Sequence, residues 1–253
     1  VTLSPHATEL VFAAGAGDRL IGATSFSNFP PQAQLIPRVG DASRLDRERL
    51  LALRPDLIVA WPSGNRPQDL AWLDERGIVV YRSEPRELQD IAGNIRDIGR
   101  LAGTESDAEA AAEAFSTRLT ELRRAYAEKT PLSVFYQIWS KPLMTVGAGH
   151  LINRVLSLCG GRPLFPDLVP LTPTVAREAV ILANPQAIVA ALPERDGGDP
   201  FAQWRRWTDL EAVRDNRLIG VDPDLIHRPT PRILDGAEAV CHGLHDGTRP
   251  AGQ

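Results

Sequence analysis

Residues 104–129, TESDAEAAAEAFSTRLTELRRAYAEK, decide the fold of this chain. The stretch has no glycine or proline, and the helix-forming residues Ala, Glu, Leu and Arg dominate it until Pro131 follows. Its apolar residues recur at helical spacing, so one stripe of the helix is expected to be buried. A helix of this length spans roughly 36 Å, enough to link two lobes, although one long helix inside a single globule would show the same pattern. The residues of the stripe are Ala108, Ala111, Ala112, Phe115, Leu119, Leu122 and Tyr126.

The segments on the two sides of this stretch repeat each other. Residues 47–60 read RERLLALRPDLIVA, and residues 177–190 read REAVILANPQAIVA, with Arg, Glu, Pro, Ile, Val and Ala at the same offsets. Each copy predicts a helix that stops before a proline, Pro55 or Pro185, because proline cannot continue a helix. A strand follows in each copy, so the two flanks are expected to share one architecture.

The rest of the chain alternates strands with helices, which is typical of parallel sheets covered by helices. We therefore predict an α/β protein of two Rossmann-like lobes with mostly parallel sheets, residues 1–103 and 131–253, joined by one long helix over residues 104–130. The expected strands are Val1–Ser4, Arg19–Thr24, Leu57–Trp61, Ile78–Arg82, Ser133–Trp139, Met144–Val146, Ala187–Leu192 and Arg217–Val221. The expected helices besides the long one are Thr8–Ala14, Arg44–Leu53, Gln68–Arg76, Leu88–Ala102, Leu151–Leu158, Arg177–Ala183, Phe201–Trp204 and Pro231–Leu244.

Composition narrows the functional classes. The 253 residues are 43% hydrophobic and 24% charged, which is ordinary for a globular protein. A net charge of -4 with mixed signs argues against a nucleic-acid binder. No apolar run approaches the roughly 20 residues that cross a bilayer. The first residues lack the basic segment of a signal peptide, so we expect a mature chain from which the signal peptide has been removed.

The sequence carries poor signals for catalysis. It contains no G-x-S-x-G, no P-loop, no complete G-x-G-x-x-G and no H-E-x-x-H. Of the five histidines only His242 and His245 are close in sequence, and a solvated helix face explains that pair. We therefore expect neither an enzyme nor a bound cofactor or structural metal ion.

Aromatic residues gather just after the predicted strands. Phe26 and Phe29 follow the second strand, Trp61 follows the third, and Trp139 follows SVFYQI. Ligands of open α/β sheets bind outside the carboxyl ends of the strands, and aromatic planes there suit a large flat ligand. Core packing is the competing explanation for each aromatic residue taken alone.

The two cysteines, Cys159 and Cys241, leave two interpretations open. They are too few for a zinc site, and no C-x-x-C occurs. They are either buried thiols in a reducing compartment or a disulfide formed outside the cytoplasm.

Several segments together give the chain a family resemblance. It resembles the class III periplasmic binding proteins, the receptors for haem, siderophores and corrinoids, and within them the receptors that pass vitamin B12 to a bacterial ABC importer. The segments that carry the resemblance are Thr2–Gly15 (TLSPHATELVFAAG), Phe26–Gln34 (FSNFPPQAQ), Leu51–Trp61 (LALRPDLIVAW), Leu158–Gly161 (LCGG), Asn184–Val189 (NPQAIV) and Pro231–Ile233 (PRI).

The resemblance implies a corrinoid held in a cleft between the lobes. It places Phe26 and Trp61 where the family stacks aromatic rings on the ligand, and Asp224 and Arg228 where it has a polar pair. It also implies a disulfide between the two cysteines, and with it the periplasm.

The chain departs from the family pattern at three contact positions. Ala42 and Thr172 stand where the family has tryptophans, and Met144 where it has phenylalanine. Trp139 is a neighbouring aromatic residue that we expect to compensate in part. These departures leave open which corrinoid is bound, or whether another tetrapyrrole takes its place.

Two alternatives of the same class follow from other residues. A haem receptor would use Tyr136, His150 or His227 as an iron ligand. His227 is also a candidate axial ligand for cobalt, with an ordinary loop histidine as the alternative. A siderophore receptor would use arginines, for which the candidates are Arg44, Arg66 and Arg228.

The resemblance also implies partners. Receptors of this family act as monomers that dock on a membrane permease through one acidic residue on each lobe. Glu178 matches the acidic residue of the C-terminal lobe. Pro67 occupies the N-terminal position, so Asp69 is the nearby substitute.

Overall fold

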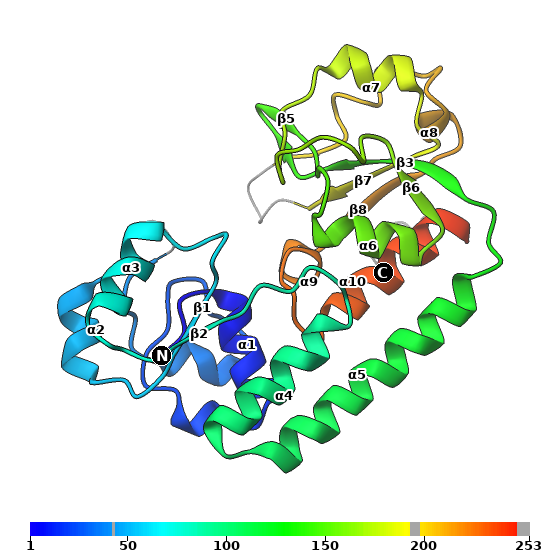
Figure 1. Ribbon diagram of the computed structural model, residues 1–253. Coiled ribbons are helices and arrows are strands. Elements are labelled where there is room, and N and C mark those ends of the chain that lie inside the picture. The colour runs from blue at the N-terminus through cyan, green and yellow to red at the C-terminus, as the bar shows by residue number, and fades with distance from the viewer. Residues whose placement is uncertain (42–43, 193–197, 247–253) are drawn as a thin grey trace. The chain divides into compact units, whose positions relative to one another are not determined.

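The computed structural model describes residues 1–41, 44–192 and 198–246 (Figure 1). The chain forms two compact units. The first comprises Val1–Pro85 and Gln89–Ser116, and the second comprises Arg86–Leu88 and Thr117–Gln253. The predicted long helix is confirmed as α5, Glu105–Tyr126, which begins in the first unit and ends in the second.

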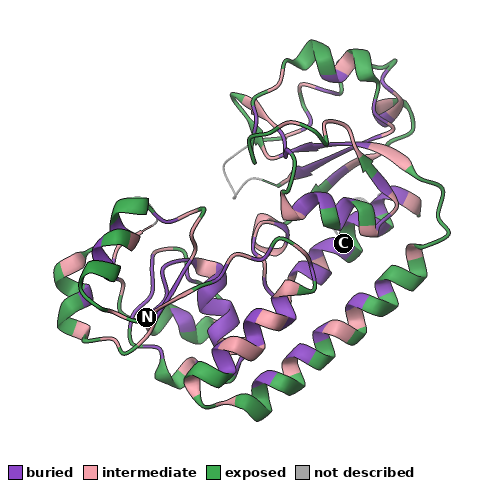
Figure 2. Cartoon of the chain, viewed as in Figure 1, coloured by how far each residue is buried: buried purple, intermediate pink, exposed green. Residues whose placement is uncertain are grey.

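The apolar stripe of α5 is buried at five of its seven predicted positions, and Ala111 and Tyr126 are half-buried. Ala108, Ala112, Phe115, Leu119 and Leu122 are all less than a tenth exposed. Figure 2 shows these buried positions recurring along the helix between exposed ones. The packing of this stripe, more than intrinsic helix propensity, holds such a helix in place.

The first unit contains a parallel sheet made of short pieces. Strand β1, Ile58–Ala60, pairs in parallel with β2, Val80–Arg82. Single parallel bridges extend this ladder, from Val59 to Thr2, from Thr2 to Ala23, and from Ala23 to Arg38. The helices of this unit are α1 (Pro5–Ala13), α2 (Arg47–Leu53), α3 (Pro67–Glu75) and α4 (Asp90–Ala102), with 3-10 turns η1 (Gly17–Arg19) and η2 (Pro31–Leu35).

The predicted strands Val1–Ser4 and Arg19–Thr24 are wrong in extent, because only the bridges at Thr2 and Ala23 remain of them. Helix α1 begins earlier than expected, at Pro5, and the hydroxyl of Ser4 accepts a hydrogen bond from the backbone N–H of Ala7 at 3.3 Å. Serine followed by proline is a helix-start signal, and here it ends the first strand.

The second unit holds a four-stranded parallel sheet in the order β6-β3-β7-β8. In Figure 1, α6 and α10 cover one face of this sheet and α7 and α8 the other. The strands are β3 (Leu132–Gln137), β6 (Gly161–Pro163), β7 (Ala187–Ala191) and β8 (Leu218–Val221), beside a small antiparallel pair, β4 (Trp139–Ser140) and β5 (Leu143–Met144). The helices are α6 (Leu151–Leu158), α7 (Arg177–Ala183), α8 (Glu211–Arg214), α9 (Pro223–Ile226) and α10 (Ile233–His245).

The predicted helix Phe201–Trp204 is wrong, since this segment forms turns. Tertiary packing decides its shape: the Trp204 ring is fully buried, and its indole N–H donates to Gln137 Oε1 at 2.7 Å. Strand β6 and helices α8 and α9 were not predicted, because three or four residues give no readable periodicity.

The internal repeat is confirmed in the backbone. Helices α2 and α7 are both seven residues long and bury one side chain each, Leu50 and Val180. Each ends on a non-glycine residue in the left-handed region, Arg54 with φ 48° and Asn184 with φ 46°. In each copy of the repeat this residue stands immediately before the proline. A parallel strand follows each helix, so the two units share one building block.

A disulfide ties α6 to α10 in the second unit. Cys159, at the end of α6, is bonded to Cys241 of α10, with 4.6 Å between their Cα atoms, and both residues are fully buried. The oxidised interpretation of the cysteine pair is therefore the correct one. Among the described residues, none of the helices combines the length and apolar character that a membrane span requires.

Candidate functional site

Two of the predicted ligand-binding residues follow the carboxyl ends of strand segments in the parallel sheet of the first unit, and the bridge residue Thr2 lies between those two segments. Phe26 follows the bridge residue Ala23, and Trp61 follows β1. Phe26 has a positive φ of 65° and its residue is 72% exposed, whereas Trp61 is half-buried. The Phe26 ring is exposed, and its backbone conformation is unfavourable for a bulky residue. Both features fit a ligand-contact site better than a position in the core.

The Trp61 ring is fixed by its own turn. Its backbone N–H donates to Asn65 Oδ1 at 2.7 Å, and Asn65 Nδ2 donates to the carbonyl of Leu3 at 2.8 Å. The ring meets His6 edge-on at 5.1 Å. It also lies against Gly64, where a Cβ would come within 1.9 Å of the ring, so any other residue there would displace the ring. Sequence analysis missed these supports, although the turn WPSGN carries the signal.

Three predicted residues of the second unit come together around β5. Trp139 faces Met144 across the β4–β5 pair, and Met144 forms an antiparallel bridge with Thr174. The exposed Thr172 lies on that same neighbouring segment. Trp139 is 62% exposed, and its indole N–H donates to the carbonyl of Lys141 at 3.0 Å.

The polar pair Asp224 and Arg228 forms an ion pair. Arg228 Nη2 lies 2.6 Å from Asp224 Oδ1, with the arginine side chain 10% exposed and the aspartate side chain 36% exposed. The carboxylate of Asp222 caps the short helix α9 by accepting from the backbone N–H of Asp224 at 2.8 Å. The pair therefore offers one donor-rich and one acceptor-rich group on a defined turn.

The candidate haem ligands lie in one cluster. Tyr136, fully buried in β3, hydrogen-bonds through its hydroxyl to His227 Nε2 at 2.9 Å. Burial lowers the pKa of His227 to about 4, against the opposing effect of Asp224. Burial and the nearby His227 lower the pKa of His150 to about 4. Both imidazoles are therefore neutral near pH 7. Sequence reasoning missed the bond between Tyr136 and His227, because 91 residues separate them.

The two candidate docking residues differ in their surroundings. Glu178 is exposed in the first turn of α7. Asp69 is buried, and its Oδ1 accepts from Nη2 of Arg47 at 2.7 Å. Its carboxylate is thus committed within the unit and is poorly placed to meet a partner.

The remaining predicted residues are located as follows. Arg44 and Arg66 are exposed, while Ala42 lies outside the described residues. Within the described ranges, no group of three or more His, Cys, Asp or Glu side chains is arranged to hold a metal ion.

Comparison with known protein families assigns the chain to one of them. The chain belongs to the periplasmic binding protein family, whose sequence model matches residues 1–225.

Comparison with individual proteins shows which of them the chain is similar to. The chain is 39% identical over 242 residues to the vitamin B12-binding protein of Vibrio cholerae, covering 95% of this chain and 87% of that protein. It is also similar to the crystal structure of the periplasmic vitamin B12 binding protein BtuF of Vibrio cholerae, with a TM-score of 0.90, 38% identity, and coverage of 97% and 96% of the two chains. A likeness in fold extends to the periplasmic heme-binding protein RhuT from Roseiflexus sp. RS-1, with a TM-score of 0.84, 22% identity, and coverage of 98% of each chain.

Proposed function

We propose that this chain captures a corrinoid, cobalamin or a close relative, in the periplasm and delivers it to the membrane permease of an ABC importer. The observation that carries the proposal is 39% identity, along most of both chains, to a protein named for binding vitamin B12. The buried disulfide between Cys159 and Cys241 supports a location outside the reducing cytoplasm.

The site residues have distinct roles in this proposal. Phe26, Trp61 and Trp139 offer aromatic faces to the corrin ring, and Met144 and Thr172 offer smaller contacts. The corrin ring carries amide side chains, whose N–H groups suit Asp224 and whose carbonyls suit Arg228.

The proposed mechanism is capture without a chemical step. No cofactor takes part, and the corrinoid is the cargo. Phe26 and Trp61 belong to residues 1–103 and the other proposed contacts to residues 131–253, and the helix over residues 104–130 links the two lobes. The receptor acts as a monomer, and Glu178 orients it on the permease, since exposed charges of this kind set orientation and association rate.

A second candidate, a haem receptor, is favoured by one observation. Tyr136, His150 and His227 lie close together, and neutral imidazoles are able to bind iron. Against it, the Tyr136 hydroxyl is buried and bonded to His227.

Isothermal titration of the ligand-free protein with cyanocobalamin, cobinamide and haemin tests both candidates. One-to-one submicromolar binding of cyanocobalamin is expected. Binding of cobinamide alone would indicate a receptor for truncated corrinoids. Binding of haemin with no binding of either corrinoid would overturn the proposal in favour of the haem receptor.

A further inference from the structure

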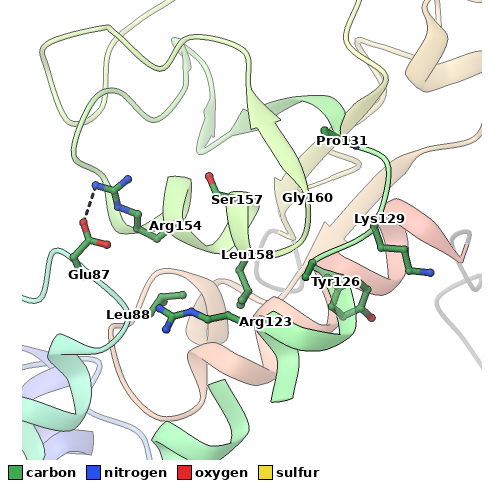
Figure 3. A pocket seen from close by; sticks show the side chains of 11 residues that line it. Glu87, Leu88, Arg123, Tyr126, Lys129, Pro131, Arg154, Ser157, Leu158 and Gly160 are labelled. Atoms are coloured by element: carbon green, nitrogen blue, oxygen red, sulfur yellow. Dashed lines mark ion pairs between the residues drawn. The ribbon is translucent and has the colours of Figure 1, made fainter. Parts of the chain in front are cut away.

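A hollow of about 380 Å³ lies within the second unit. None of the residues that line it belongs to the proposed corrinoid contacts. Its wall comes from three places: Glu87 and Leu88, the end of α5 with the residues that follow it, and α6 from Arg154 onward with Gly160 beyond it (Figure 3). A volume of this size admits a small organic molecule.

The charge of this hollow is opposite to that of the chain. Three cationic side chains line it, Arg123, Lys129 and Arg154, against the single carboxylate of Glu87. The whole chain carries a net charge of -4, so this excess of positive charge is local. Figure 3 shows Arg123 and Arg154 on the side of the hollow next to Glu87 and Leu88.

An ordinary structural role explains part of this arrangement but not all of it. Cations near the end of a helix interact favourably with its dipole, which accounts for Arg123 in the last turn of α5. Arg154 lies in the middle of α6, where that effect is absent. It forms an ion pair with Glu87 at 2.7 Å, with both side chains at least 40% exposed, and a pair so exposed adds little stability.

Apolar groups complete the site. Leu88 is buried and Leu158 is half-buried, and both line the hollow together with the two arginines (Figure 3). A wall with guanidinium groups at one side and leucine side chains beside them suits a ligand with an anionic head and an apolar body.

We propose that this hollow binds a small organic anion, with its phosphate or carboxylate group on Arg123 and Arg154 and its apolar body on Leu88 and Leu158. The occupant would contact Glu87 and Leu88, which belong to the three-residue segment Arg86–Leu88 that joins the second unit between two stretches of the first. Occupation would therefore hold this segment more firmly to α5 and α6.

Phenyl phosphate is the probe that tests the proposal. Titration calorimetry measures its binding, and amide hydrogen exchange measures its effect on the segment Arg86–Leu88. We expect saturable one-to-one binding and slower exchange at residues 86–88. Arg123→Gln should weaken binding about tenfold or more, because it removes a charge-assisted contact. Arg124→Gln is the matched control, since Arg124 is the exposed neighbour on α5 that does not line the hollow, and it should leave binding unchanged.

Two further arms make the outcome decisive. Leu158→Ala should weaken binding of phenyl phosphate but not of inorganic phosphate, and circular dichroism verifies that each variant is folded. Absence of saturable binding, or equal binding by the Arg123→Gln and unchanged proteins, would overturn the site. Inorganic phosphate binding as tightly as phenyl phosphate would overturn the apolar half of the proposal.

Discussion

Trp139 and Met144 lie directly opposite each other in the antiparallel pair β4–β5. Side chains paired in this way share one face of the ladder, about 5 Å apart at Cβ. We therefore expect Trp139 to compensate in part, within the proposed site, for the smaller side chain of Met144. The exposed face of Trp139 is thus the strongest aromatic candidate of the second unit for contact with a flat ligand.

Trp139→Ala should weaken cobalamin binding, measured by titration calorimetry. Losing most of one aromatic face costs about 2–3 kcal/mol, which corresponds to roughly 30- to 150-fold in affinity. Trp207→Ala is the control, because Trp207 is also exposed, at 45%, but belongs to none of the proposed contacts. Equal affinity of the Trp139→Ala and unchanged proteins would remove Trp139 from the site.

Asp224→Asn should lower both corrinoid affinity and the free energy of unfolding. The Arg228 side chain is 10% exposed, so replacing the Asp224 carboxylate with a neutral amide weakens the charge compensation of a poorly solvated cation, at a cost of about 1–3 kcal/mol. Urea unfolding measures the stability effect. Asp74→Asn is the comparison, because Asp74 pairs with Arg82 where both side chains are more than 40% exposed, and it should cost less than about 1 kcal/mol.

The fold was readable from the sequence where local signals were strong. The long apolar stripe of α5 and the proline-terminated repeat of α2 and α7 predicted two α/β units and their connection. The short pieces failed for physical reasons. Ser4 and Pro5 start a helix at the end of the predicted strand Val1–Ser4. The burial of Trp204 favours turns over the predicted helix Phe201–Trp204.

The candidate site was readable only in part. Positions after strands identified Phe26, Trp61 and Trp139 as candidates, because parallel strands end at one edge of a sheet. Contacts between distant segments have no local signature, which is why the bond between Tyr136 and His227 and the burial of Asp69 against Arg47 emerged only from the structure.

Reduction of the disulfide should destabilise the second unit. Cys159 and Cys241 close a loop with a sequence separation of 82 residues, and the chain-entropy model gives about 4–5 kcal/mol for such a loop. Urea unfolding with and without a thiol reductant measures the difference. A Cys159→Ala/Cys241→Ala variant should show the lower stability and no response to reductant. An unchanged midpoint after verified reduction would contradict the prediction.

The half-buried histidines His150 and His227 should make stability fall in acid. Their folded-state pKa values of about 4 lie below the ordinary 6.5, so the unfolded chain binds protons that the folded chain excludes. Their contribution is fully present above pH 6.5 and is lost as pH falls toward 4, by up to about 3 kcal/mol for each ring.

The pH dependence of the unfolding midpoint tests this linkage. A His150→Asn/His227→Gln variant should lose much of the slope between pH 6.5 and 4, since neither replacement gains a proton. Asparagine at position 150 keeps an N-cap side chain for α6. The exposed His242→Gln serves as the control and should retain the slope. An unaltered slope in the variant that lacks both histidines would refute the assignment.

Glu178→Gln should slow delivery of cobalamin to the permease without changing cobalamin affinity. Glu178 is an exposed first-turn carboxylate of α7, so its loss alters a charge on the surface and no described packing.

Such a residue also stabilises its own helix dipole by about 0.3–1 kcal/mol, and this local role must be separated from docking. Glu105→Gln provides that separation, because Glu105 is an exposed carboxylate in the first turn of another helix, α5. Transport into vesicles containing the permease should fall for Glu178→Gln alone, and the loss should shrink at high salt, since screening weakens rim electrostatics. Equal transport by the two variants would show that Glu178 has no role in docking beyond stabilising its own helix.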